Sequence, residues 1–266
     1  MTLRAVDSNF FRTWSKEMAY VLGVIAADGC LVRHANGFHG LDITTKDHAW
    51  LCQIKKALGS SHKIGQKPRG YRLQIRNQTI YSDLIRIGLT PRKSKTLRFP
   101  KIERSYLPDF VRGDFDGDGT VWLWKDPRWR HPWQLKASFY SGSRIFLEEL
   151  RSLLQRHANL SAGSLTTLPT AFELRYGIAD GLKLYRWMYQ YRPALCLQRK
   201  RARFEQFLAL KKVEVERRNG KSRRIQSRRR LAHSGDARIQ GTGTPMKHSG
   251  VPGIPRFGSA KILKAP

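Results

Sequence analysis

The densest group of carboxylates in the chain is the run DFDGDG at residues 114–119, in which three aspartates alternate and glycine follows. This spacing is typical of the start of an EF-hand calcium loop, where alternate side chains converge on one cation. The bidentate glutamate of such a loop would stand at the position of Lys125. Because lysine adds repulsion where the loop needs two oxygens, the sequence favours another kind of metal site.

A second Asp-Gly pair, Asp28-Gly29, ends an apolar stretch with helical character, just as Asp118-Gly119 ends a helix predicted from residue 107. A carboxylate at a helix C-terminus is disfavoured by the helix dipole, and two neighbouring carboxylates repel each other. Bound divalent cations would remove both penalties. Small residues four apart, at 23 and 27 and again at 113 and 117, predict close packing of the two helices, with the aspartates side by side.

The elements around these aspartates are predicted to occur twice, in the order helix, strand, strand, helix, strand, strand, helix. The first set covers residues 20–28, 31–45 (hairpin), 46–58, 63–76 (hairpin) and 78–87; the second covers 107–118, 121–140 (two strands), 144–156, a hairpin ending at 176, and 181–189. Internal duplication of this kind predicts an α+β fold of two pseudo-symmetric αββαββα units.

The domain boundaries follow from this pattern and from the fading of apolar residues near the C-terminus. Residues 1–95 form the first half, with residues 1–14 expected to be flexible, and residues 96–210 form the second half. Residues 211–266 hold 15 basic and 3 acidic residues. Too little apolar surface remains there to offset ordering entropy, so a basic disordered tail is expected.

The charge of the chain points to a polyanionic partner. The sequence has 50 Lys and Arg against 20 Asp and Glu, a formal net charge of +30, and the excess is not confined to the tail. Nucleic acid is the leading partner and an acidic membrane surface the second.

The longest apolar run, residues 19–27, is too short to span a bilayer, and no signal peptide opens the chain. A cytosolic location is expected, or an organellar matrix if the gene is organellar. Three widely spaced cysteines argue against a disulfide framework and a zinc site.

At this point the residues resemble a known family. VLGVIAADG at 21–29 and VRGDFDGDG at 111–119 look like the two copies of the LAGLIDADG motif of single-chain homing endonucleases. GLTPRKS at 88–94 and LPDFVRG at 107–113 strengthen the match, which covers about residues 15–210. The resemblance implies a monomer that straddles double-stranded DNA with two saddle-shaped antiparallel sheets, packed through its motif helices. It also implies Mg²⁺, or Mn²⁺, as the cofactor.

The resemblance also assigns a catalytic site. It implies Asp28 and Asp118 as metal ligands, together with the backbone carbonyls of Ala27 and Gly117, and a basic residue near each scissile phosphate. Lys93 and Lys200 match these basic positions best, although Arg199 competes with Lys200. Since the first motif copy has Ala26 where the second has Asp116, a pseudo-symmetric site does not need Asp116, which is expected to matter little for metal binding.

Alternation of apolar and polar residues in YRLQIR (71–76) and QLKASF (134–139) predicts sheets with one core face and one polar face. Acids are scarce on these strands, which favours base and phosphate contacts over an idle surface. The candidate DNA contacts are Arg33, Thr44, Lys67, Arg69, Arg72, Gln74, Arg76, Lys125, Arg128, Arg130, Gln134, Lys136, Ser138 and Arg175.

These observations predict a sequence-specific, metal-dependent endonuclease that hydrolyses phosphodiester bonds of double-stranded DNA. Two other functions stay open on the same scaffold: an RNA-binding maturase that helps an intron fold, and a catalytically inactive DNA-binding regulator. Intein activity is disfavoured, because the chain has neither a nucleophilic first residue nor a terminal His-Asn pair.

Overall fold

The computed structural model describes residues 5–33, 37, 39–129, 132–191 and 193–236. The chain divides into two compact units after Val215. The first unit contains both predicted halves and is the one that bears on function. No helix of the described residues is long and apolar enough to cross a membrane.

The first half has the predicted order of elements. They are α1 (Lys16–Asp28), β1 (Gly29–Arg33), β2 (His39–Thr45), α2 (His48–Ala57), β3 (Ile64–Lys67), β4 (Gly70–Arg76) and α3 (Gln78–Ile87). The four strands form one antiparallel sheet in the order β1-β2-β4-β3.

The second half repeats this order. Its elements are α4 (Leu107–Asp118), β5 (Thr120–Lys125), β6 (Trp133–Ser141), α5 (Arg144–Ala158), β7 (Ser164–Thr167), β8 (Phe172–Tyr176) and α6 (Ile178–Tyr189). The sheet order, β5-β6-β8-β7, has the same topology as the first. Two short 3₁₀ helices, η1 (Lys93–Lys95) and η2 (Arg104–Tyr106), lie on the connection between the halves. The α+β fold of two pseudo-symmetric units is therefore confirmed.

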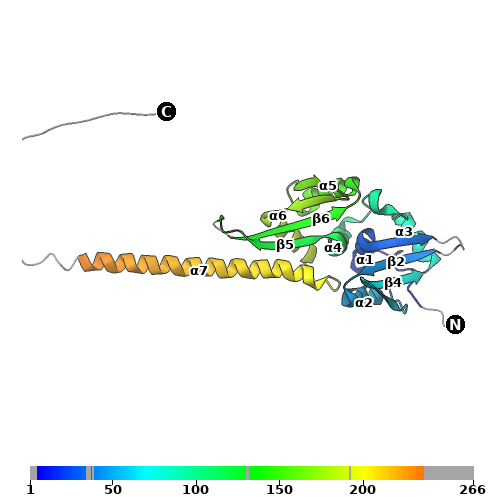
Figure 1. The fold of residues 1–266 in the computed structure, drawn as a ribbon, viewed down its shortest axis with the longest axis horizontal. Helices are drawn as coiled ribbons and strands as arrows, with labels where there is room; N and C mark the ends of the chain where they lie inside the picture. Colours follow the sequence, from blue (N-terminus) through cyan, green and yellow to red (C-terminus); the bar gives the residue numbers. More distant parts are fainter. Residues whose placement is uncertain (1–4, 34–36, 38, 130–131, 192, 237–266) are drawn as a thin grey trace, which may run out of the picture. The chain divides into compact units, whose positions relative to one another are not determined.

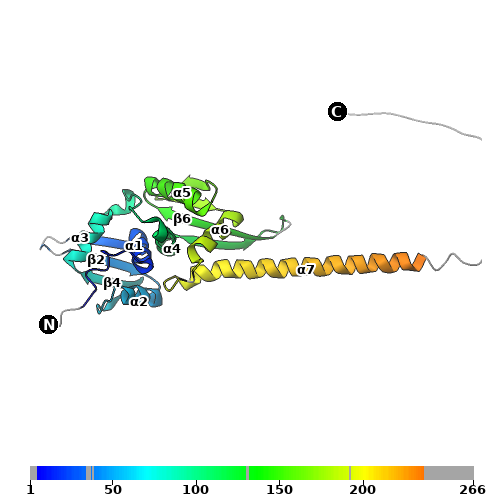
Figure 2. The ribbon, with the colours of Figure 1, turned by 180° about the vertical axis from the view of Figure 1, so that it is seen from behind.

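Helices α1 and α4 pack against each other between the two sheets (Figure 1; from behind in Figure 2). The approach is possible because of glycine. A Cβ at Gly23 would overlap the backbone carbonyl of Phe110, and a Cβ at Gly113 would overlap that of Tyr20. The small-residue strips predicted from the sequence thus form the contact between the halves, in which main chain touches main chain.

Each sheet has one face on the hydrophobic core. Leu41 and Ile43 of β2 lie beside Ile75 and Leu73 of β4, and all four side chains are buried. Helices α5 and α6 pack on the second sheet (Figure 2). The opposite faces carry the intervening polar residues, so the predicted two-sided pattern holds.

Two expectations about the chain ends need correction. Residues 5–14 were expected to be flexible but pack on the first half: Phe11 is 2% exposed, and Asn77 Nδ2 donates a hydrogen bond to Ser8 Oγ at 2.8 Å. Residues 211–236 continue helix α7 (Gln198–Asp236), where disorder was predicted. That stretch contains no proline and is rich in Lys and Arg, which favour helix even where little surface is buried. Residues 237–266 lie outside the described residues.

Candidate catalytic site and nucleic-acid interface

The two motif helices end beside each other, each at an aspartate. Gly29 and Gly119, in extended conformation, turn the chain directly into β1 and β5. A Cβ at Gly117 would lie 2.5 Å from Ala27 Cβ and 3.4 Å from Asp28 Oδ2, so glycine at position 117 lets the helix ends come this close. The sequence-predicted pair, Asp28 and Asp118, is thereby brought together at the junction of the two halves.

Burial and mutual repulsion disfavour the charged forms of this pair of carboxylates. Burial and the neighbouring charge of Asp118 raise the pKa of Asp28 to about 6, from an ordinary value of 3.8. Burial also raises the pKa of Asp118. Since a raised carboxylate pKa means that the charged form is disfavoured, this site favours any cation that can approach both side chains.

Lys93, at the start of η1 after α3, and Lys200, in the first turn of α7, approach the same place. They are 6% and 5% exposed, which is unusual for lysine. Lys200 Nζ donates hydrogen bonds to the carbonyls of Phe115, Asp116 and Gly117 at 2.7, 2.6 and 2.9 Å, the C-terminal end of α4. Lys93 Nζ donates to the carbonyl of Gly29 at 2.6 Å.

Burial also lowers the pKa of both lysines, that of Lys200 to about 8. Their charges in turn favour the ionised forms of Asp28 and Asp118. The structure thus assembles two carboxylates and two ammonium groups, one of each from either half, into a single polar cluster. Arg199, the competitor of Lys200, instead pairs with Asp47 at 3.0 Å.

The donor atoms available to a metal at this cluster are all oxygens. Among the described residues there is no group of three or more His, Cys, Asp or Glu side chains placed to hold a metal ion. The candidate set is therefore Asp28, Asp118 and backbone carbonyls. The carbonyl of Gly117 already accepts from Lys200, and a carbonyl oxygen has a second lone pair. Two repelling carboxylates with carbonyls beside them fit a hard divalent cation such as Mg²⁺.

Two further carboxylates on α4 lie next to the pair and were not assigned a role by sequence. Asp114 is 3% exposed, and burial raises its pKa well above its usual range. Asp116 is 1% exposed; its Oδ2 accepts hydrogen bonds from Tyr20 Oη and from the backbone N–H of Leu197, each at 2.7 Å. Burial raises the pKa of Asp116 to about 6.

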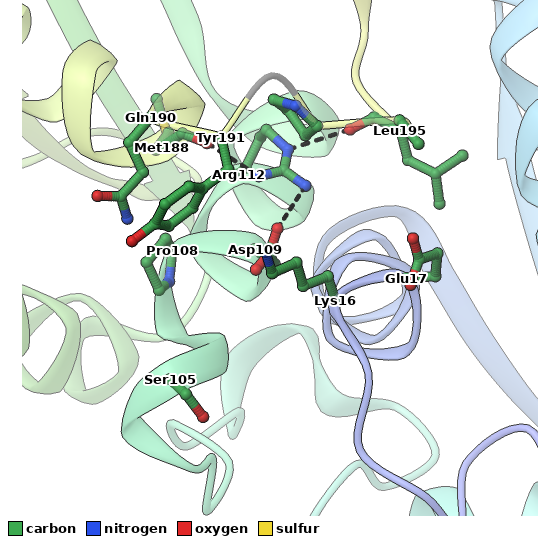
Figure 3. A pocket seen from close by; sticks show the side chains of 12 residues that line it. Lys16, Glu17, Ser105, Pro108, Asp109, Arg112, Met188, Gln190, Tyr191 and Leu195 are labelled. Carbon is green, nitrogen blue, oxygen red and sulfur yellow. Dashed lines mark hydrogen bonds and ion pairs between the residues drawn. The ribbon is translucent and has the colours of Figure 1, made fainter.

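Near the middle of α4, Arg112 is enclosed beside a pocket of about 220 Å³ (Figure 3). Its guanidinium donates to the carbonyl of Leu195 at 3.1 Å, to the carbonyl of Met188 at 2.9 Å and to Asp109 at 2.7 Å. Arg112 therefore ties α4 to the chain segment that leaves α6 and leads to Lys200. Nothing in the sequence pattern pointed to this contact.

The polar face of the first sheet carries Thr44, Arg72 and Gln74, as predicted, but also Asp42. Arg72 Nε donates to Asp42 Oδ1 at 2.7 Å, and this bond raises the pKa of Arg72. The strands at 71–76 and 134–139 hold no acid, as predicted, but the neighbouring strand β2 places Asp42 against the central arginine of this face, which the prediction did not consider. The exposed candidates at the edges of the sheet are Arg76 at the end of β4, Lys67 at the end of β3 and Arg69 in the turn between them.

The second sheet also has a buried acid on its polar face. Glu173 accepts from Ser138 Oγ at 2.7 Å, and Lys136 Nζ lies 3.5 Å from it. The predicted DNA contact of Ser138 is wrong, because this residue is 0% exposed and its hydroxyl lies inside the fold. Gln134 and Arg175 lie on the same face, and Arg175 is exposed.

Three predicted contacts outside these faces have a different placement from that expected. Strand alternation puts Arg33 on the side of Leu31 and Lys125 on the side of Leu123, away from the polar faces. Arg128 pairs with Asp126 at 2.7 Å in the loop after β5. Arg130 lies outside the described residues.

The polar face of β5 instead presents two tryptophans. Trp122 and Trp124 are 59% and 38% exposed and stand opposite Lys136 and Gln134 of β6. These two rings are not among the contacts predicted from the sequence, although they alternate with Val121 and Leu123. Exposed indole rings beside basic and amide side chains suit contacts with nucleobases.

With this geometry in view, the fold defines a class: a single chain with two LAGLIDADG-type motif helices between two antiparallel sheets. Solved structures that match it include LAGLIDADG meganuclease I-AabMI bound to uncleaved DNA, with a TM-score of 0.53 and 16% identity over 74% of this chain and 91% of that one. I-CpaMI bound to uncleaved DNA matches with a TM-score of 0.53 and 13% identity, over 81% and 97%. I-SmaMI bound to cleaved DNA matches with a TM-score of 0.52 and 12% identity, over 79% and 91%.

No protein-family model matches the sequence, and no curated protein does. At identities this low, structural likeness establishes the fold alone. The chain has the fold of the single-chain LAGLIDADG homing endonucleases, as the two motifs predicted.

Proposed function

We propose that the chain is a monomeric endonuclease that cleaves both strands of a specific DNA duplex with Mg²⁺ or Mn²⁺. The observation that carries the proposal is the cluster at the ends of α1 and α4, where each half contributes one carboxylate and one buried lysine. A monomer is proposed because one chain supplies both halves of the cluster. The DNA-bound state of the matching structures supports a duplex as the partner.

In this proposal Asp28 and Asp118 bind the metal together with the carbonyls of Ala27 and Gly117. The bound metal would supply a polarised water and charge stabilisation at the phosphate. Lys93 and Lys200 would place positive charge beside the two scissile phosphates. The polar sheet faces, with their exposed arginines and tryptophans, would hold the duplex in register on either side of the cluster.

The test is cleavage by wild type, Asp28→Asn and Asp118→Asn on a duplex selected from a random library by binding to the wild-type protein. Both substitutions should abolish cleavage with Mg²⁺ and leave the Kd within about threefold, because each removes a metal charge but no groove contact. Asp180→Asn is the control: this α6 carboxylate pairs with Lys183 at 3.0 Å, outside the cluster. It should cleave as wild type does.

Full activity in either cluster variant would remove that aspartate from the site. Duplex binding without cleavage by the wild-type protein would overturn the nuclease proposal in favour of a DNA-binding regulator. Tight binding of structured intron RNA in place of duplex DNA would favour a maturase.

A further inference from the structure

Helix α4 holds the connection from α6 to α7 by two buried side chains that lie one turn apart. Arg112, 3% exposed, bonds the carbonyls of Met188 and Leu195 (Figure 3). Asp116, 1% exposed, accepts the N–H of Leu197 at 2.7 Å. The connection is thus fixed to the motif helix immediately before α7 begins.

The last of these bonds bears directly on Lys200. The carbonyl of Leu197 accepts the backbone N–H of Lys200 at 3.0 Å, so Leu197 opens α7 and Lys200 lies in the first turn. The side chain of Lys200 then returns to α4, where its Nζ meets the carbonyls at the helix end. Asp116, Leu197 and Lys200 therefore form one closed loop of hydrogen bonds.

We call the hydrogen bonds of Arg112 and Asp116 to the connection before α7 the α4 clamp. The motif helix of the first half, α1, has no equivalent of it. Counting back from the Asp-Gly pair, the positions equivalent to Asp116 and Arg112 are Ala26 and Leu22, both buried and apolar. Lys93 is held by the carbonyl of Gly29. The two lysines thus occupy similar places in the pseudo-symmetric cluster but are positioned by different means.

We propose that Asp116 is a positioning residue for Lys200 alone, and so serves only one of the two scissile phosphates. This inference rests on the proposed nuclease function. A buried carboxylate is a strong acceptor, and its loss would leave the Leu197 N–H buried without its partner. Only Oδ2 of Asp116 accepts the Leu197 N–H, and Oδ1 has no hydrogen-bond partner among the described residues. Asparagine, which keeps one carbonyl oxygen, can therefore take over the role.

The first experiment needs neither metal nor DNA. Lysines of the free protein are acylated with a water-soluble reagent, and the rate at each site is followed by mass spectrometry. In Asp116→Ala the rate at Lys200 should rise roughly tenfold to a hundredfold while the rate at Lys93 is unchanged, because opening becomes local to the start of α7. Asp116→Asn should label as wild type does.

A control removes a comparable buried hydrogen bond elsewhere in the second half. Ser143 is 2% exposed and donates to the carbonyl of Leu97 at 2.7 Å. Ser143→Ala should leave the Lys200 rate as in wild type. An unchanged Lys200 rate in Asp116→Ala, or an equal rise at Lys93, would overturn the proposal.

The second experiment measures strand choice on a duplex labelled differently on each strand. Asp116→Ala should slow the strand that Lys200→Ala slows, by at least about tenfold, and spare the strand that depends on Lys93, so nicked product accumulates. Asp116→Asn should cut both strands. If Asp116 were a metal ligand, this substitution would remove the metal charge and abolish cleavage. Equal slowing of both strands refutes the inference. Absence of any cleavage by the wild-type protein refutes the proposed function instead. In that case the labelling experiment alone decides whether Asp116 positions Lys200.

Discussion

Replacing Asp28 by asparagine should stabilise the metal-free protein while it destroys the proposed activity. Burial and the charge of Asp118 raise the pKa of Asp28 to about 6, from 3.8. This difference in pKa corresponds to about 3 kcal/mol between the charged and neutral forms. Because asparagine is still a buried polar group, Asp28→Asn should recover roughly 1–3 kcal/mol of the free energy of unfolding at neutral pH.

The sign of this effect sets its pH dependence. A carboxylate whose folded pKa is raised binds its proton more tightly in the folded state, so its ionisation lowers stability. The loss is absent below about pH 3.8, grows as the pH rises, and is complete above about pH 6. The difference between Asp28→Asn and wild type should therefore be largest at pH 7.5 and close to zero at pH 4.

The assay is urea unfolding in a metal chelator at pH 4 and pH 7.5, with ionic strength held constant. Asp126→Asn is the control of opposite sign, because the Arg128 guanidinium lowers the pKa of Asp126 to about 2. Asp126→Asn should not stabilise the protein at pH 7.5. Mg²⁺ should then stabilise wild type more than Asp28→Asn, since a ligand of the folded state adds to its stability. If Asp28→Asn unfolds at the same or a lower urea concentration at pH 7.5, the repulsion argument is wrong.

Three further predictions concern catalysis and binding. Lys93→Ala and Lys200→Ala should each slow cleavage by about tenfold or more in a plasmid assay while Kd changes less than about threefold; equal losses in both would make these lysines phosphate contacts only. Trp122→Ala, which removes a 59% exposed indole from the polar face of β5, should weaken duplex binding about tenfold by fluorescence anisotropy, and an unchanged Kd would exclude this ring from the interface. Deleting residues 219–266, which hold 11 basic residues and one acid, should weaken binding to all duplexes alike and preserve the cleavage position; a changed position would give those residues a role in specificity.

The fold could be predicted because its signals are local and occur twice. Helix α3 was predicted with its observed limits, since Asn77 caps its start and Gly88 ends it in the left-handed conformation. The small residues of α1 and α4 predicted the helix contact for a steric reason that the structure bears out. The segment at residues 5–14 was misjudged because its anchoring partners, such as Asn77, lie far along the chain.

The site was only partly predictable, because its polar pairings depend on register and on contacts between distant segments. The closeness of Asp28 and Asp118 followed from the motif helices. The pairing of Asp42 with Arg72 did not, since it needs the alignment of β2 with β4, in which Thr44 lies opposite Arg72. Trp122 was predictable from the sequence, because alternation along β5 places it on the polar face; it was not predicted as a contact because an indole is not a polar side chain.

The contacts of Asp116 could not be predicted from pseudo-symmetry, because its counterpart in the first half is Ala26. Its counterpart Ala26 argues that a symmetric metal site does not need Asp116, and the side chain of Asp116 indeed turns to Tyr20 and Leu197. Yet the same asymmetry that argues against a metal ligand is what a one-sided positioning residue requires. The repeated backbone places Lys93 and Lys200 in similar surroundings, but the buried polar contacts that hold them differ. If the chain cleaves DNA as proposed, two equivalent lysines would share a role in the chemistry and still differ in how easily each is displaced, and the strand bias of cleavage would then depend on α4 as well as on the lysines.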